Sequence, residues 1–384
     1  MIHRKVGYGL KVAIATVFRN SNYGAVLQAY ALAKVIKDLT KSECYFIDYR
    51  REKVINMFRV SLFDKDVDGN KKITINSIKR IMKQCINPLG TIVRFNQFEK
   101  FRKKYLNITD KIYYKSNEIK LEDTPILVLG SDQIWNPDIT QGFDDVYFGK
   151  IGNPDIFTIS YAASLGKTNF NEEEKKELIE LLKYVDIISV REEEGAKLLR
   201  DLTNKKITCV PDPTILVDKE DWVKLTSNKR KKKNYIMVYM IKYDEAILNL
   251  ARKIAELYNY EIVLFGNGSL KKCKGMKEKK HYDPTIFLEY MEKADYIVTN
   301  SFHGTVFSVI FNKKFYTVPF DDKGNRIVDF CRKVGLEDRI VCDNKDLNNK
   351  DIHEDIDYES ANEKMEELKK IGKEFLSEAM GLAL

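Results

Sequence analysis

The sequence lacks the features of a membrane-spanning, secreted or disulfide-stabilised protein. It contains no run of about 18 or more apolar residues, and the short apolar stretch near its N-terminus is typical of a buried strand rather than of a signal peptide. The six cysteines include no C-x-x-C pair, which is typical of reduced cysteines in the core of a cytosolic protein. We therefore expect a cytoplasmic protein, either free or at the inner face of the membrane.

The sequence also lacks the motifs of several ligand-binding classes. No G-x-G-x-x-G follows the first predicted strand and no Walker A lysine motif occurs, which argues against a nicotinamide dinucleotide or ATP site. Asp132 and Asp212 form no metal-binding pattern with any of the four histidines, so we predict no metal and no cofactor. The lysine runs have no interleaved aromatic residues, which argues against nucleic acid as a partner.

What is present is the composition of a globular protein, with 44% hydrophobic and 32% charged residues. The 384 residues suit two domains, and the net charge of +8 suits an anionic substrate. In both halves, predicted strands alternate with amphipathic helices, which is typical of parallel sheets covered on both faces. The sequence predicts the α/β fold class, with two doubly wound, Rossmann-like domains that face a cleft.

A polar segment at 218–234, which ends in a lysine-rich run, is the predicted domain boundary. It separates an N-terminal α/β domain, residues 1–220, from a C-terminal α/β domain, residues 230–355. Charged sequence dotted with aromatic residues interrupts the first domain and predicts a helical insert at about 50–120. A long amphipathic helix is predicted within residues 356–384.

Ligands of doubly wound sheets bind outside the carboxyl ends of the strands, so the loops that follow strands are the places to search. Five such loops are polar or marked by glycine, at 19–24, 130–137, 164–166, 191–195 and 300–304. The candidate substrate-binding residues in and beside them are Asn22, Gly24, Ser131, Gln133, Trp135, Asn136, Ser164, Asn300, Ser301, Gly304 and Thr305.

His303 is the first candidate catalytic residue. The segment NSFHG follows a predicted strand and opens a helix at Gly304 or Thr305, so backbone N–H groups there would point at a bound anion. A histidine beside a bound anion can supply a proton near neutral pH. A histidine that only caps the turn is the alternative.

Arg191 is the second candidate, because it ends the apolar strand IISV. A guanidinium at that place can bind a carboxylate or a phosphate through two hydrogen bonds. Glu192, Glu193 and Glu194 offer it local partners instead, so an ordinary salt bridge remains the alternative.

The segment GSDQIWNP combines an acid, two amides and an indole, which together could bind a sugar by hydrogen bonds and stacking. Asp132 could act as a general base for a hydroxyl. The alternative is a structural loop with Asx turns, in which Trp135 packs inside the protein. Asn22 and Gly24, at the mouth of the first helix, fit either an anion or sugar site or a plain turn.

Six of these segments, in this order, make the chain resemble the polysaccharide pyruvyl transferase family from about residue 11 to about residue 340. GSDQIWNP is the most specific of them, and the ordered set is more specific than any member. The segments are NYGAVLQAYAL (22–32), GSDQIWNP (130–137), ISYAASLG (159–166), SVREEEG (189–195), VPDPTIL (210–216) and TNSFHG (299–304).

The resemblance implies a fold like that of the GT-B glycosyltransferases, with the acceptor on the N-terminal domain, the donor on the C-terminal domain, and the C-terminal helix packed back on the first. It also implies that phosphoenolpyruvate, as a co-substrate, gives its carbon skeleton to two hydroxyls of a sugar, so that a cyclic pyruvate ketal forms and phosphate leaves. In this family the residues that match Arg191 and His303 are assigned to donor binding and proton donation. The implied partner is a glycan or a lipid-linked sugar.

One position departs from the family pattern. Many members carry an arginine two residues before the histidine, where this chain has Ser301, and Arg326 or Lys323 are the candidates to replace it. The alternative functions are a nucleotide-sugar glycosyltransferase, for which GNGSL (266–270) is a weak nucleotide site, and a non-catalytic anion- or glycan-binding relative. If the acceptor is lipid-linked, the basic aromatic segment from Arg94 to Tyr105 could make a peripheral membrane contact; packing on its own domain is the alternative.

Overall fold

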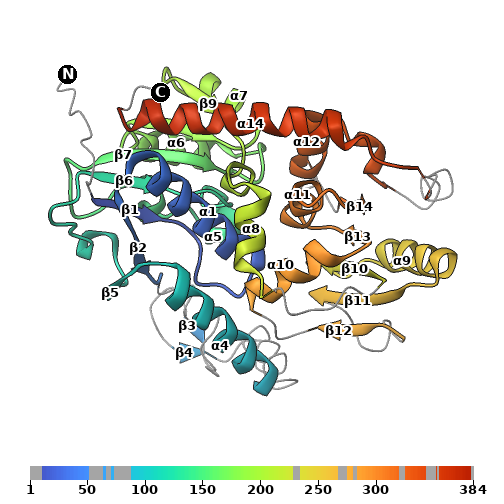
Figure 1. Cartoon of the computed structure of the whole chain (residues 1–384). Coiled ribbons are helices and arrows are strands. Elements are labelled where there is room, and N and C mark those ends of the chain that lie inside the picture. The colour runs from blue at the N-terminus through green and yellow to red at the C-terminus, as the bar shows by residue number, and fades with distance from the viewer. Residues whose placement is uncertain are drawn as a thin grey trace.

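The computed structural model describes residues 11–51, 64–65, 71–72, 88–227, 234–266, 275–279, 283–319, 325–342, 352 and 354–381. Within these residues the chain forms two separate parallel sheets, each flanked by helices (Figure 1). The predicted class, α/β with two doubly wound sheets, is therefore confirmed. Lys323, residues 267–270 of GNGSL and most of the helical sequence predicted at 73–85 lie outside the described residues.

The first sheet has seven strands in the order β5-β2-β1-β6-β7-β8-β9, and every neighbouring pair is parallel. The order changes direction between β1 and β6, so the loops after these two strands diverge at the switch point where such sheets bind ligands. The strands are β1 (Lys11–Ala15), β2 (Glu43–Tyr49), β5 (Ile108–Tyr113), β6 (Ile126–Leu129), β7 (Phe157–Ala163), β8 (Ile187–Val190) and β9 (Ile207–Cys209). The helices are α1 (Tyr23–Thr40), α4 (Pro88–Tyr105), α5 (Pro137–Thr140), α6 (Glu172–Leu182), α7 (Glu193–Leu202) and the 3-10 turns η1 (Ser116–Glu118), η2 (Asp145–Phe148) and η3 (Pro213–Leu216).

The second sheet has five parallel strands in the order β12-β11-β10-β13-β14. Its switch point lies between β10 and β13, and the loop after β13 is NSFHG. The strands are β10 (Tyr235–Met240), β11 (Glu261–Gly266), β12 (Lys277–Lys279), β13 (Tyr296–Thr299) and β14 (Lys314–Thr317). The helices are α9 (Glu245–Tyr258), α10 (Pro284–Lys293), α11 (Phe302–Ile310), α12 (Asn325–Val334) and the 3-10 turn η5 (Glu337–Arg339); α8 (Lys219–Leu225) precedes this sheet.

The predicted helical insert at about 50–120 is only partly helical. Its described part holds α4, but also β5, which pairs in parallel with β2 at the edge of the first sheet. A short antiparallel ladder joins β3 (Asp64–Lys65) to β4 (Lys71–Lys72). The expectation of a purely helical insert was wrong because a charged edge strand carries only a weak apolar alternation, as in ITDKIY.

A single apolar core joins the two sheets. It contains Val12 and Ile14 of the first sheet together with Met237 and Phe265 of the second. Tyr23, at the start of α1, stacks on Phe287 of α10 with ring centroids 4.3 Å apart and planes 7° apart. We call each sheet with its flanking helices a body, the first body for the seven-stranded sheet and the second for the five-stranded sheet. An apolar interface of this kind restricts rotation of one body against the other.

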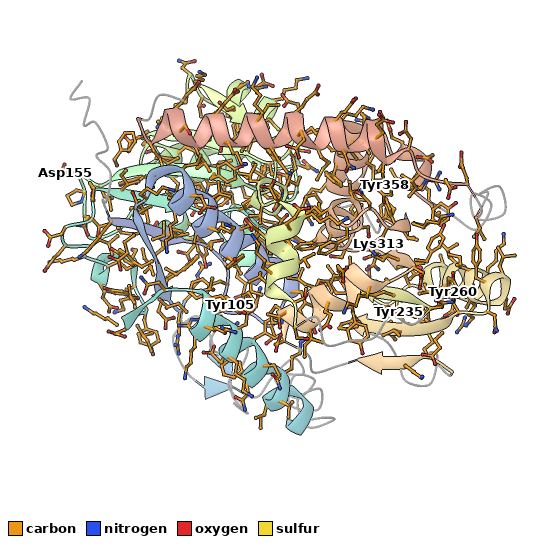
Figure 2. The ribbon with its side chains drawn as sticks, viewed as in Figure 1. Tyr105, Asp155, Tyr235, Tyr260, Lys313 and Tyr358 are labelled. Atoms are coloured by element: carbon orange, nitrogen blue, oxygen red, sulfur yellow. The ribbon has the colours of Figure 1, made fainter. Side chains whose placement is uncertain are left out.

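The helix α14 (Tyr358–Ala379) runs across both bodies (Figure 1). It packs on α1 and η3 of the first body and on α12 of the second. The Tyr358 hydroxyl donates to the carbonyls of Lys313 and Ser308, and Tyr358 and Lys313 both lie in the second body (Figure 2). Close approach to the first body occurs at Gly372, where an added Cβ would meet the side chains of Leu216 and Tyr161 at 2.6 Å.

The described cysteines do not share one environment. Cys331 is buried, Cys44 and Cys209 are half-buried, and Cys342 is exposed. The expectation of core cysteines therefore fails for Cys342. No helix in the described part of the chain is both long enough and apolar enough to span a bilayer.

Candidate functional site

A narrow pocket lined by both charged and apolar side chains lies where loops from both sheets meet. Arg191 and Glu192 follow β8, Asp212 follows β9, Phe302 begins α11 after β13, and Arg326 belongs to α12 after β14. All of these residues come after the carboxyl ends of parallel strands, which is where α/β sheets bind ligands. The open space among them is about 20 Å³, which is room for roughly one water molecule.

Asp212 is at the centre of this pocket and is fully buried. Its Oδ2 atom accepts hydrogen bonds from Arg191 Nη1 at 2.7 Å and Ser131 Oγ at 3.0 Å, and it lies 3.6 Å from His303 Nε2. Its Oδ1 atom caps η3 by accepting from the Thr214 amide and hydroxyl. Burial alone would raise the pKa of Asp212, but His303, Arg191 and the Thr214 hydrogen bond lower it far below its usual range. The carboxylate is therefore ionised at neutral pH.

Arg191 and Arg326 bring two guanidinium groups into the same pocket. Burial alone would lower the pKa of Arg191, but the Glu192, Asp212 and Asp132 carboxylates raise it, so the group stays charged. Burial and the positive charge of Arg191 lower the pKa of Arg326. Arg191 Nη2 and Arg326 Nε are buried and have no hydrogen-bond partner within the described residues. Two cations with unused donors are an arrangement that an anion would stabilise.

His303 lies in the first turn of α11, with its side chain at the seam between the two bodies. Ser301 caps this helix by accepting from the Gly304 amide at 3.2 Å, so the helix starts at Phe302, two residues earlier than predicted. The imidazole packs on the first turn of α1, where a Cβ added to Gly24 would lie 2.1 Å from His303 Nδ1. Its Nε2 atom is buried and forms no hydrogen bond within the described part of the chain.

Arg191 and His303 are thus brought together, because both contact one oxygen of Asp212. The predicted domain boundary at 218–234 lies between them in the sequence, and the described structure brings both side chains to one carboxylate.

Asp132 lies on the same side of the first sheet, directly after β6. It has a positive φ of 74° and forms an isolated bridge with Ala163. Its carboxylate is close enough to influence the pKa values of Arg191 and Arg326, as well as that of Tyr239 on β10. Burial raises the pKa of Tyr239 to about 12. Its Oδ1 atom accepts from the Gln133 amide at 2.9 Å, as in the predicted Asx turn, and Asp132 is not among the residues that line the pocket.

Four predicted site residues have structural roles instead. Trp135 is fully buried, stacks on Phe148, and donates from Nε1 to the Tyr147 carbonyl, so it offers no stacking face to a sugar. Asn136 is buried and caps α5. The Asn300 side chain holds the loop after β10, at Ile241 N and Lys242 O.

Thr305, the fourth, is buried; its hydroxyl donates to Ser301 O and lies 2.9 Å from the Thr317 hydroxyl, from which it can accept. For Trp135 and Asn136 a structural role is the alternative that the sequence left open. Each of the four residues is polar or aromatic and near a strand end, but its side chain points inward.

The remaining predicted residues lie around the pocket in supporting contacts. Asn22 caps α1 through Ala25 N. Ser131 donates to Asp212, and Ser164 donates to Glu192 Oε1 at 2.6 Å. The Gln133 Oε1 atom accepts from Asn136 Nδ2. Gly304 allows α11 to approach Thr299 and Tyr239, which an added Cβ would meet at 2.4 and 3.0 Å.

Asp212 and Glu192 were not among the predicted site residues. Glu192 accepts from both Arg191 and Ser164, and its Oε2 is buried without a partner among the described residues. Asp212 looked like a turn residue because an aspartate before Pro213 is typical of a helix cap. Its membership in the ordered segment VPDPTIL was the signal that could have identified it.

Two larger hollows lie elsewhere. One of about 500 Å³ is lined by residues 121–125 and 153–156, and one of about 590 Å³ is lined by Tyr258, Tyr260 and the segment 292–296 with its neighbours. Asp155 and Tyr260 mark them at opposite ends of the molecule (Figure 2). Both hollows lie before the amino ends of strands, and no lining side chain among the described residues has an unused buried polar atom. Neither hollow therefore combines a position at the carboxyl ends of strands with buried polar atoms that lack a partner, as the pocket around Asp212 does.

The helix α4 packs inward over much of its length. Phe98, Phe101 and Arg102 are buried, whereas Ile92, Val93 and Phe95 are 56%, 42% and 49% exposed. The packing alternative therefore holds for the second half of the helix. Contact of its exposed start with a membrane stays a prediction.

Fold and site together define a class: an α/β protein of two parallel sheets with a pocket of arginines and carboxylates at the carboxyl ends of its strands. The sequence model of the polysaccharide pyruvyl transferase family matches residues 22–322, which is most of the chain. The protein belongs to this family. No curated protein matches the sequence significantly.

Several solved structures are distantly similar. UDP-GlcNAc 2-epimerase from Methanocaldococcus jannaschii has 15% identity over 89% of this chain and 91% of that chain, with a TM-score of 0.46. UDP-GlcNAc 2-epimerase from Neisseria meningitidis, bound to UDP-GlcNAc, has 9% identity over 95% and 94%, with a TM-score of 0.48. The SsfS6 glycosyltransferase of Streptomyces sp. SF2575 has 12% identity over 94% and 96%, with a TM-score of 0.40. Similarity at this distance does not bear on substrate.

Proposed function

We propose that this protein is a pyruvyl transferase that uses phosphoenolpyruvate as co-substrate and a sugar of a cell-surface polysaccharide precursor as acceptor. The observation that carries the proposal is the pair of arginines in one pocket, Arg191 and Arg326, each with a buried donor atom that has no partner among the described residues. His303 meets Arg191 at the Asp212 carboxylate. Phosphoenolpyruvate has a carboxylate and a phosphate, so it needs two cationic contacts, and its methylene carbon needs a proton. Membership in the family supports the same reaction.

The reaction balances with the groups of this site. His303 gives a proton to the methylene carbon, which becomes a methyl group, while a sugar hydroxyl oxygen bonds to the neighbouring carbon. The second hydroxyl oxygen then bonds to that carbon as the carbon–oxygen bond to phosphate breaks. Of the two hydroxyl protons, one restores the proton that His303 gave and the other leaves with phosphate. Asp132, on the first body, is the proposed acceptor of a hydroxyl proton.

Arg326 supplies the cation that the family pattern places at position 301. In this chain Ser301 is occupied as the cap of α11. Arg326 approaches from α12 and is close enough to Arg191 for its pKa to be lowered by that charge. The two guanidinium groups repel each other until an anion lies between them, which favours donor binding.

The test is phosphate release from phosphoenolpyruvate in the presence of a mixed pool of sugar acceptors, with the ketal methyl group followed by NMR. His303→Ala should lose turnover by about 10² to 10⁴-fold and keep donor binding, because it removes only the general acid. Asp132→Asn should fold normally and lower turnover. Release of a nucleotide from a nucleotide sugar would instead identify a glycosyltransferase, and binding of donor or glycan without turnover would identify a non-catalytic relative.

Arg191→Lys tests the donor site separately. An ammonium group cannot form the two parallel hydrogen bonds of a guanidinium, so the Kd for phosphoenolpyruvate should rise. The matched control is Arg200→Lys, because Arg200 is an exposed arginine of α7 that also pairs with a glutamate, Glu193. Equal donor affinity in both variants would contradict the assignment of Arg191.

A further inference from the structure

Asp212 contacts the donor-binding arginine and the proton-donating histidine at once. Its Oδ2 atom accepts a hydrogen bond from Arg191 Nη1 at 2.7 Å and lies 3.6 Å from His303 Nε2. Its Oδ1 atom accepts from the Thr214 hydroxyl. The carboxylate comes from the loop after β9 of the first sheet, whereas His303 comes from α11 beside the second sheet. Asp212 therefore links the two bodies at the point where the chemistry is proposed.

A chain of buried hydrogen bonds fixes the place of this carboxylate. Gln28 Nε2, on α1, donates to Thr16 Oγ1 at 3.1 Å, and Thr16 Oγ1 donates to the Ser131 carbonyl at 2.9 Å. The Ser131 hydroxyl then donates to Asp212 Oδ2 at 3.0 Å. The four residues are buried and come from α1, the end of β1, the end of β6 and the start of η3. A buried chain in which each donor is used holds its members rigidly.

We propose that Asp212 is a positioning residue that holds the Arg191 guanidinium and the His303 imidazole in one fixed arrangement and stabilises the protonated imidazole until the proton is transferred. The proposal rests on the proposed function for the identity of the donor. The link matters because the acid and the donor-binding cation must act on one molecule, and a displacement of about 1 Å can cost about 10²-fold in rate.

The chain offers a matched control in Asp144. It is also buried, it caps the 3-10 turn η2 by accepting from the Val146 amide, and it also pairs with an arginine, Arg51, at 3.2 Å. Asp144 is not among the residues that line the pocket around Arg191. A change at Asp144 therefore reproduces the loss of a buried, capping, arginine-paired carboxylate without touching the reaction.

The experiment compares Asp212→Asn with Asp144→Asn. The amide of Asp212→Asn keeps the size of the side chain but has no charge for Arg191 or His303. We expect kcat to fall by about 10²-fold. The dependence of kcat on pH should also change, because a carboxylate 3.6 Å from the reacting imidazole has been removed. Asp144→Asn should lower the melting temperature and leave kcat and the pH profile unchanged.

The other charged or titratable groups around the pocket are the same in both variants, so a change in the pH profile reports on Asp212. These groups are Asp132, Arg191, Glu192, Tyr239, Arg326, Asp329 and Lys333. A kcat and pH profile of Asp212→Asn equal to those of the unaltered protein would overturn the proposal. Equal losses of kcat in both variants would do the same, because they would show a merely structural role.

Crystal structures of the two variants give a readout that does not need turnover. In Asp212→Asn we expect Arg191 Nη1 and His303 Nε2 to shift relative to each other by about 1 Å or more. Unmoved side chains in that structure would contradict the positioning role. If the unaltered protein releases no phosphate from phosphoenolpyruvate, the proposed function is wrong, but the structures still decide whether Asp212 positions these two groups.

Discussion

The absence of a side chain at Gly24 makes room for the His303 ring. Gly24 is buried in the first turn of α1, and a Cβ there would lie 2.1 Å from Nδ1 and 2.5 Å from Cγ of His303. Because Cγ is the root of the imidazole, the whole ring would have to move. The conformation of Gly24 itself is ordinary, so the need for glycine comes from this approach alone.

Gly24→Ala should therefore lower kcat by about 10²-fold through displacement of the ring. Its free energy of unfolding should change by only about 1–3 kcal/mol, because steric cost is partly offset by the better helix propensity of alanine. The control is Gly195→Ala in α7, where the added Cβ would meet the end of the Leu165 side chain at 3.1 Å and would lie in ordinary contact with Glu192 Oε2 at 4.0 Å. Kinetics and urea unfolding of both variants check this; a normal kcat in Gly24→Ala would contradict it.

The Asp212 carboxylate should also make stability depend on pH. The pKa of Asp212 is lowered in the folded protein. Its contribution to the free energy of unfolding is therefore present above the pKa of an aspartate in the unfolded chain, about 3.9, and is lost as pH falls below that value. The free energy of unfolding should consequently fall more steeply below about pH 4 in the unaltered protein than in Asp212→Asn. Urea unfolding at a series of acidic pH values measures the difference, and parallel curves would refute the assignment.

The roles of single side chains were harder to predict from the sequence than the fold. Arg191 and His303 could be found because the ends of strands are visible in the apolar pattern. Trp135 and Asn300 stand in the same kind of loop, but whether a side chain points into the pocket or into the core depends on packing against residues distant in sequence, such as Phe148 for Trp135. Asp212 was missed for the same reason, since its partners come from four separate segments.

Among the elements, central strands were predictable and edge strands were not. The segment IISV forms β8 as predicted, because strands buried on both faces are continuous apolar runs. The segment YIMVYM of β10 is a run of the same kind. The edge strands β5 and β12 are charged, as ITDKIY and KEK show, and edge strands often carry lysine. Their sequence therefore resembles that of loops or exposed helices.

The helix α4 braces the loop that precedes α1. Arg102 is fully buried, donates from Nη1 to the carbonyls of Phe18 and Asn20 at 3.2 Å, and pairs with Glu99 at 2.7 Å. Arg94 donates to Ser21 O at 2.8 Å and lies over the Tyr23 ring. The loop between β1 and α1 is thereby fixed by a helix outside the sheet.

Arg102→Met should lower the free energy of unfolding by about 3 kcal/mol, the low end of the range for a broken buried pair, because Glu99 is partly exposed and can be solvated. The control Lys104→Met, at an exposed position of the same helix, should change it by about 0.5 kcal/mol or less. Chemical denaturation checks both. A loss of similar size in the two variants would show that α4 does not brace the loop through Arg102.

At the scale of the whole molecule, the two sheets share one apolar core, so they should unfold together. Tyr23 belongs to the first body and is surrounded by Tyr239, Phe265 and Phe287 of the second. Tyr23→Ala should cost about 3–5 kcal/mol, as for other large aromatic truncations in a core. Calorimetry of the unaltered protein should show one transition with equal calorimetric and van't Hoff enthalpies. Two separated transitions would contradict the shared core.

The small volume of the pocket among Arg191, Arg326 and Asp212 has a kinetic consequence. With about 20 Å³ of open space, this conformation cannot hold phosphoenolpyruvate. Because the common core resists separation of the two bodies, donor binding at this pocket would require its walls to part locally. Donor binding and phosphate release would then limit the rate of turnover, so kcat would fall as solvent viscosity rises. The rate of a single turnover that starts from bound donor would not depend on viscosity.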